Sequence, residues 1–136
     1  MNKISKNALI FFANLAIPAN YKINKGLGDL LEFNNQNDDF SPKKFVIKNN
    51  NFLIKISSLI NSNISSYEDF LKKINEEVDS PQLKYFLEEF RVFAIKNYFS
   101  NKYVIKKMKL IENFKYDKID KNKDQLILNS LIDNDS

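Results

Sequence analysis

The chain has 136 residues, a formal net charge of +4 and a hydrophobic content of 43%, and it contains no cysteine and no histidine. That length suits one domain with a real hydrophobic core. The missing residue types exclude disulfides, thiolate metal sites, cysteine nucleophiles and the Ser-His-Asp triad. Two glycines are too few for a phosphate-binding loop or a dinucleotide fingerprint, so most common catalytic arrangements are absent.

The first predicted helix covers residues 5–17 and ends at Pro18. Proline disfavours the helical conformation in the residue that precedes it, which sets this boundary. The predicted apolar face has helical spacing and consists of Leu9, Phe12, Ala13 and Ala16, with Ile10 and Ile17 beside it.

The same N-terminal residues also resemble a secretory signal, because Lys3 and Lys6 precede a run of about ten apolar residues. Asn14 interrupts that run, and bulky Ile17 would occupy an unsuitable position before a cut after Ala19, so we favour the helix. The run is also shorter than the roughly 20 apolar residues that a transmembrane helix needs, and we predict no membrane span.

The next segments give weaker signals. A short second helix is predicted to begin at Gly26, with the apolar residues Leu27, Leu30, Leu31 and Phe33. Residues 34–44 are polar and carry Pro42, so we predict a surface loop, and residues 45–47 are too short an apolar run to assign. Asparagines at 49–51 precede a predicted helix whose shared face is formed by Phe52, Ile56, Leu59 and Ile60.

Two helix starts are clearer. Ser66 and Asp69 have the spacing of a variant capping box, and a predicted buried stripe follows, formed by Tyr67, Phe70, Leu71 and Ile74. Asp79-Ser80-Pro81 marks the next start, because proline in the first turn has no N–H that needs a partner. The helix that follows, to about residue 99, is apolar almost all round, and such a helix is normally central.

A last helix is predicted from residue 102 to residue 113. No alternation typical of strands persists, so the predicted fold class is all-α, an irregular bundle of five or six helices around a central hydrophobic helix. We expect a single helical domain over residues 1–116 and a polar, loose tail over residues 117–136. Within that tail, residues 126–132 have the apolar content to dock as a short helix.

Residues 102–123 contain eight lysines against three acidic residues. Such a stripe could follow phosphates, with Tyr103, Phe114 and Tyr116 available to stack on bases. The plainer interpretation is a solvated helix face, because a dedicated phosphate reader is expected to use more arginine.

Arg91 is the only arginine, and it lies in the most hydrophobic predicted helix. A lone arginine among lysines suggests a site that needs a planar group with several donors, such as an interface anchor. The plainer interpretation, which we favour, is an intrachain salt bridge with Glu88, its neighbour on the same face. Two acidic clusters, residues 76–79 and 38–39, lack the ordered ligand spacing of a cation site.

The N-terminal stretch reads Asn14-Leu15-Ala16-Ile17-Pro18-Ala19, followed after a gap by Gly26-Leu27 and by Leu30-Leu31-Glu32-Phe33. This pattern resembles the start of the gluconate 2-dehydrogenase subunit 3 family. Asn14 takes the position that is acidic in that family, and Pro18 and Gly26 take the turn positions. Residues 82–90 and the sequence Tyr98-Phe99-Ser100 are similar to the family's later helix and its aromatic ending.

The resemblance implies a non-catalytic helical accessory subunit that binds, stabilises and escorts a larger flavin-dependent dehydrogenase of the glucose-methanol-choline oxidoreductase type, alongside a cytochrome subunit. It implies FAD in that partner, no cofactor in this chain and a periplasmic location; without the resemblance, a cytoplasmic location is expected. No catalytic or metal-binding residue is predicted. The residues expected to contact the partner are Pro18, Tyr21, Gly26, Arg91, Tyr98 and Phe99.

The alternative function is that of a small basic helical protein that associates with nucleic acid through residues 102–123. Binding that weakens steeply with salt would distinguish it from an apolar protein interface. A third interpretation, a carboxylate enzyme or small-ligand binder, would need a pocket where two acids converge.

Overall fold

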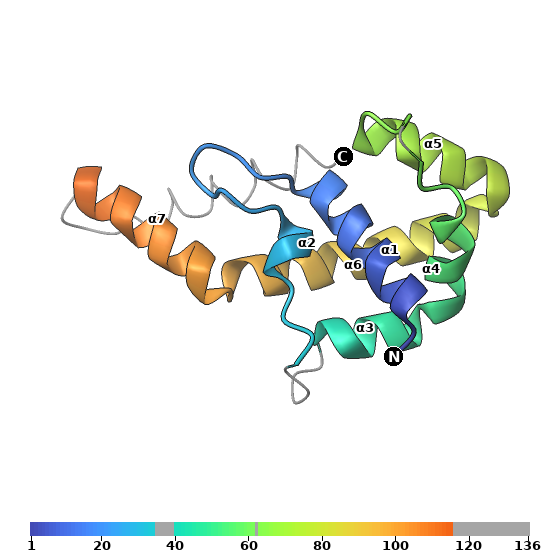
Figure 1. Ribbon diagram of the computed structural model, residues 1–136, viewed down its shortest axis with the longest axis horizontal. Helices are drawn as coiled ribbons and strands as arrows, with labels where there is room; N and C mark the ends of the chain where they lie inside the picture. The colour runs from blue at the N-terminus through green and yellow to red at the C-terminus, as the bar shows by residue number, and fades with distance from the viewer. Residues whose placement is uncertain (35–39, 62, 116–136) are drawn as a thin grey trace.

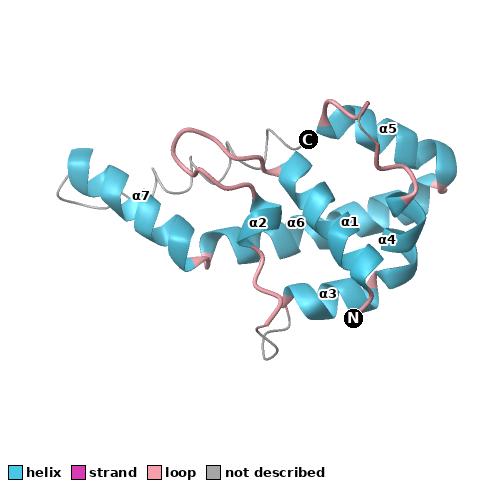
Figure 2. Cartoon of the chain, viewed as in Figure 1, coloured by secondary structure: helices cyan, strands magenta, loops and turns pink. Residues whose placement is uncertain are grey.

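The computed structural model describes residues 1–34, 40–61 and 63–115, except for the side chains of 110–115. Across these ranges all regular secondary structure is helical, and loops connect the helices (Figure 2). This confirms the all-α class. Within these ranges seven helices form, where five or six were expected. They are α1 (Lys3–Ala16), α2 (Leu27–Leu30), α3 (Pro42–Lys48), α4 (Asn50–Ser57), α5 (Tyr67–Glu77), α6 (Ser80–Phe99) and α7 (Lys102–Lys115).

The long helix α6 runs along the bundle, and α1 crosses in front of it in the view of Figure 1. Helices α2, α3, α4 and α5 all pack against α1, while α2, α5 and α7 pack against α6. Helix α5 lies at one end of the bundle and α7 extends from the other end (Figure 1). The predicted central helix therefore shares the centre of the bundle with the N-terminal helix.

Aromatic side chains form the middle of the core. The ring of Phe12 on α1 is fully buried and makes edge-on contacts with Tyr67 of α5 and with Phe86 and Phe90 of α6. Phe86 is also in contact with Phe52 of α4, whose ring stacks on it with the ring centroids 4.2 Å apart. Edge-on and offset rings of this kind add attraction beyond the burial of their area. One hydrophobic cluster thus joins α1, α4, α5 and α6.

The two clear helix starts are confirmed. The backbone N–H of Asp69 donates to Ser66 Oγ at 3.1 Å, and the N–H of Gln82 donates to Asp79 Oδ1 at 2.7 Å. The reciprocal half of the predicted capping box is not formed with Ser66, because the Asp69 carboxylate accepts from the Ser65 hydroxyl instead. Of the predicted stripe on α5, Phe70 and Ile74 are fully buried, and Tyr67 and Leu71 are half-buried.

The loop predicted for residues 34–44 is wrong at its C-terminal end, because α3 begins at Pro42. Ser41 caps this helix by accepting from the N–H of Lys44 at 3.1 Å, and Pro42 stands in the first turn. The start of α6 is similar, because there too a capping side chain, that of Asp79, precedes a proline in the first turn. The apolar residues 45–47 were too few to reveal a helix of only seven residues.

Both glycines allow α2 to approach α1 closely. A Cβ atom on Gly28 would lie 2.1 Å from the carbonyl oxygen of Ile10, and one on Gly26 would lie 2.3 Å from Asn14 Oδ1. The Asn14 side chain completes the junction, since its Oδ1 accepts from the N–H of Asp29 at 3.3 Å. Asn14 therefore holds α1 to the start of α2.

Candidate functional site

An apolar groove of about 640 Å³ lies between α5 and α6, and the end of α1 closes it at Ile17. Its floor is formed by buried side chains of α6, including Leu83 and Ala94. Half-buried apolar side chains remain accessible along its walls: Leu71, Leu87, Ile95 and Phe99. Helix α6 can line the groove and fill the core together because apolar residues surround almost its whole circumference.

The rim of the groove carries three charged side chains, Lys84, Glu88 and Arg91, all of them exposed. Arg91 forms no ion pair with another described residue, so the expected bridge to Glu88 is not present. The chain's only guanidinium therefore stands beside an apolar surface with its donors available to another molecule.

The six residues predicted to contact a partner fall into three places. Arg91 and Phe99 both line the groove. Pro18 and Tyr21 are exposed on the loop between α1 and α2, where Tyr21 is 88% exposed. Gly26 and Tyr98 are buried within the chain's own packing and present no surface to a partner, which corrects their assignment. The contacts of the other four with a partner remain predictions.

The exposed loop between α1 and α2 is held by Asn20. Its Oδ1 accepts from the backbone N–H groups of Lys22 and Ile23, both at 2.8 Å, and its own N–H donates to the Ile23 carbonyl. Ile23 is buried and anchors the turn, which leaves Tyr21 at the outside. Burial raises the pKa of the Tyr98 phenol beneath this loop, and the nearby Asn20 side chain partly offsets that effect.

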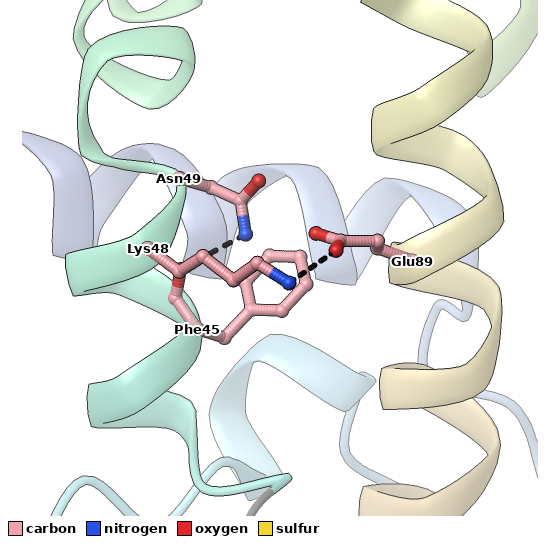
Figure 3. Close-up of polar contacts among 4 residues, drawn as sticks. All are labelled: Phe45, Lys48, Asn49 and Glu89. Atoms are coloured by element: carbon pink, nitrogen blue, oxygen red, sulfur yellow. Dashed lines mark hydrogen bonds and ion pairs between the residues drawn. The ribbon is translucent and has the colours of Figure 1, made fainter.

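A second hollow, of about 400 Å³, lies between α3 and α6 and contains a charged pair. Lys48 extends from α3 and donates to Glu89 on α6 (Figure 3). The other Glu89 oxygen, Oε2, is buried and meets no donor within hydrogen-bond geometry in the described part of the chain. Asn49 is oriented by a bond to the Phe45 carbonyl and lies across from Glu89 (Figure 3).

Two opposing effects set the pKa of Glu89. Burial raises this pKa, but the hydrogen bond from Lys48, the nearby Tyr85 hydroxyl and the Lys48 charge together outweigh it, so the pKa lies below its ordinary value of 4.5. The same pair raises the pKa of Lys48 above 10.5, chiefly through the hydrogen bond to Glu89. The pair therefore stabilises the fold above pH 4.5, and this contribution is lost as the pH falls through the lowered pKa of Glu89.

We expect the variant Lys48→Met to raise the pKa of Glu89, because burial is then opposed only by the weaker contributions of Tyr85 and Asn49. A pH titration of the Glu89 carboxyl carbon by NMR measures this directly. Lys55→Met, which removes an exposed lysine from α4, is the matched control and should leave the Glu89 titration in place. An unchanged Glu89 titration in Lys48→Met would show that the pair does not hold the carboxylate.

The described part of the basic stripe surrounds one aromatic ring. Lys25 Nζ and Lys107 Nζ lie 4.9 and 5.5 Å from the ring centroid of Tyr103, so the loop before α2 and α7 share a basic patch. Lys102, Lys106 and Lys109 are exposed on the same helix. The side chains of residues 110–123 lie outside the described residues, as does the predicted tail.

The acidic clusters do not combine into a metal site within the described ranges, where no three acidic side chains form a group able to hold an ion. Asp79 instead caps α6, and residues 38–39 lie outside these ranges. Among the helices that the structure describes, none is both long enough and apolar enough to cross a bilayer. Comparisons of the chain with protein-family models, with curated proteins and with solved structures give no match.

Proposed function

We propose that this chain is a non-catalytic helical accessory subunit that binds a larger protein through the groove between α5 and α6. The observation that carries the proposal is the groove itself, an apolar surface with an available arginine at its rim. Apolar centres with arginine anchors are typical of protein interfaces. An amphipathic helix of the partner is the shape that such a groove between two helices accepts.

A two-carboxylate enzyme site is less well supported at this position. The described lining of the groove contains one carboxylate, that of Glu88, which stands at the exposed rim. General acid–base work by two carboxylates needs both to converge on one substrate. The groove therefore favours binding over chemistry.

We further propose that the partner is a large flavin-dependent dehydrogenase subunit, which this chain stabilises and escorts, alongside a cytochrome subunit. The resemblance of residues 14–33 and 82–100 to the gluconate 2-dehydrogenase subunit 3 family supports this class of partner. The FAD then belongs to the partner. The exposed turn with Pro18 and Tyr21 offers a second contact beside the groove.

Association with nucleic acid is the second candidate function, and the basic patch around Tyr103 favours it. Lysines from the α1–α2 loop and from α7 converge on that ring, as in surfaces that combine phosphate contacts with an aromatic platform. Binding of this kind loses affinity steeply as salt rises. An apolar groove keeps its partner at the same salt concentration.

The substitution Arg91→Ala tests the groove proposal. We expect it to weaken partner binding about tenfold or more, the effect of an interface anchor. We expect the free energy of unfolding of the isolated chain to change by no more than about 0.5 kcal/mol, because the side chain is exposed and forms no ion pair with another described residue. Binding is measured by titrating captured partner, and stability by thermal unfolding.

The matched control is Lys72→Ala, which removes one positive charge from an exposed position on α5 outside the groove lining. It should leave partner binding unchanged. A large loss of stability with unchanged binding in Arg91→Ala would assign this arginine a structural role and contradict the groove proposal.

A further inference from the structure

The C-terminal part of the same chain contains a segment whose chemistry matches that of the groove between α5 and α6. Residues 124–136 read DQLILNSLIDNDS, which is an apolar run between acidic residues, with three acids and no base. This part of the chain lies outside the described residues, so its position is inferred from its sequence and from the groove alone. We propose that residues 124–133 occupy the α5/α6 groove in the isolated protein and are displaced by the partner.

The apolar residues of this segment fit the groove. Ile127, Leu128, Leu131 and Ile132 fall at helical spacing on one face, and Asn129 and Ser130 fall on the other. The groove offers a matching strip of half-buried leucine, isoleucine and phenylalanine side chains along α5 and α6. When the segment covers that strip, apolar surface of the segment and of the groove is removed from water, and this burial favours docking.

The charges match as well. Asp124 and Asp133 flank the apolar run and would be about 13.5 Å apart in a helix. Lys84 and Arg91 at the rim are separated along α6 by about 10.5 Å, and neither is paired with another described residue. Residues nine positions apart lie on opposite sides of a helix, so a docked helical segment brings one of its two acidic ends toward a base at the rim. This arrangement gives the lone arginine a carboxylate that its planar fork can bind.

The intervening chain is long enough for the segment to return. Helix α7 begins at Lys102, three residues after Phe99 at the end of the groove, and its 14 residues extend about 21 Å. The ten residues from 116 to 125 can span up to about 33 Å, so residue 126 can reach the groove. Because the tether is short, the effective concentration of the segment is high, and weak contacts suffice to fill the site.

This inference goes beyond partner binding and is tested on the isolated full chain, so its failure would leave the partner proposal standing. The chain has no cysteine, so Ser130→Cys accepts a single spin label on the polar face of the segment. We expect the NMR amide signals around Leu71, Leu87 and Ile95 to lose most of their intensity in the presence of the paramagnetic label. The reference is the same sample after the label has been reduced to its diamagnetic form. In a mixed sample, one chain carries the spin label without isotope enrichment, and the other is isotope-labelled and has no cysteine. The signals of the isotope-labelled chain should show no such loss.

The matched control carries the same label together with Leu128→Asp and Leu131→Asp, which should restore the groove signals without changing the folded core. Three results would overturn the proposal. Broadening centred on Lys102–Lys109 would place the acidic segment on the basic helix. Broadening in the mixed sample would assign the groove to a second copy of the chain. The absence of localised broadening would show that the segment does not dock.

Discussion

Phe12→Ala is expected to lower the free energy of unfolding by about 3–5 kcal/mol, the cost of deleting a buried aromatic side chain. The ring is fully buried on α1 and contacts rings of α5 and α6 with centroid distances between 4.7 and 6.2 Å. Its removal leaves a cavity where three helices meet. The free energy of unfolding of a domain is only about 5–15 kcal/mol, so this single substitution removes a large part of it.

The neighbouring substitution Phe11→Ala is the matched control for this prediction. Phe11 is half-buried and its ring contacts only Phe70 among the described aromatic pairs, so its removal should cost less than that of Phe12. Denaturant unfolding of both variants measures the difference through the transition midpoints. Equal losses of unfolding free energy in the two variants would contradict the central position of Phe12 in the aromatic core.

Gly28→Ala is expected to destabilise the chain by about 1–3 kcal/mol, although alanine is a better helix former than glycine. The added Cβ would lie 2.1 Å from the backbone carbonyl of Ile10, so α1 and α2 must separate. Alanine also restricts the unfolded chain, but this entropic effect stabilises the folded state by only about 0.4–1 kcal/mol. The free energy of unfolding, measured by denaturant titration, should therefore fall.

Gly26→Ala provides the comparison, because the shortest contact of its added Cβ, 2.3 Å, is with a side chain, while the nearest backbone atom, the Ile17 carbonyl oxygen, is 3.3 Å away. The clash is with Asn14 Oδ1, and in an Asn14→Ala background the cost of Gly26→Ala should shrink. The cost of Gly28→Ala should persist in that background, since the Ile10 carbonyl is still in place. A Gly28→Ala variant as stable as the parent would show that the two helices do not approach as closely as described.

Local signals predicted the helices that begin with a cap and continue with a long apolar pattern. Asp79-Ser80-Pro81 predicted the start of α6, and Ser66 predicted that of α5, because each signal is complete within four residues. Ser41-Pro42 is the same kind of signal, but only seven helical residues follow it, and the surrounding polar residues favoured a loop. Short helices depend on tertiary packing, which a local pattern does not contain.

The asparagines show the same limit. Several of them join elements that are distant in sequence. Asn97 donates to the Phe40 carbonyl and Asn101 to the Leu30 carbonyl, at 2.9 and 3.0 Å, while Asn101 also caps α7. No spacing rule relates residues 101 and 30. Such contacts emerge only once the helices have packed.

The candidate site was predictable in part. The single arginine of the sequence suggested either a salt bridge with Glu88 or an interface anchor. The structure places Arg91 at the rim of a groove and shows no ion pair between it and another described residue, and the anchor role stays a prediction. The walls of the groove from α5 were not predicted, because Leu71 was assigned to a buried stripe and is only half-buried. Gly26 and Tyr98 were assigned to the surface through the resemblance, which carries no information on burial.

We propose that this chain binds a flavin-dependent dehydrogenase through the apolar groove between α5 and α6. The most direct measurement is affinity capture of the tagged, full-length chain from its native host at low and high salt, followed by mass spectrometry and flavin absorbance. We predict that a flavoprotein dehydrogenase is retained at high salt, because apolar contacts are not screened. Recovery of nucleic acid that disappears as the salt concentration rises, with no flavoprotein retained, would contradict the account and favour the basic patch.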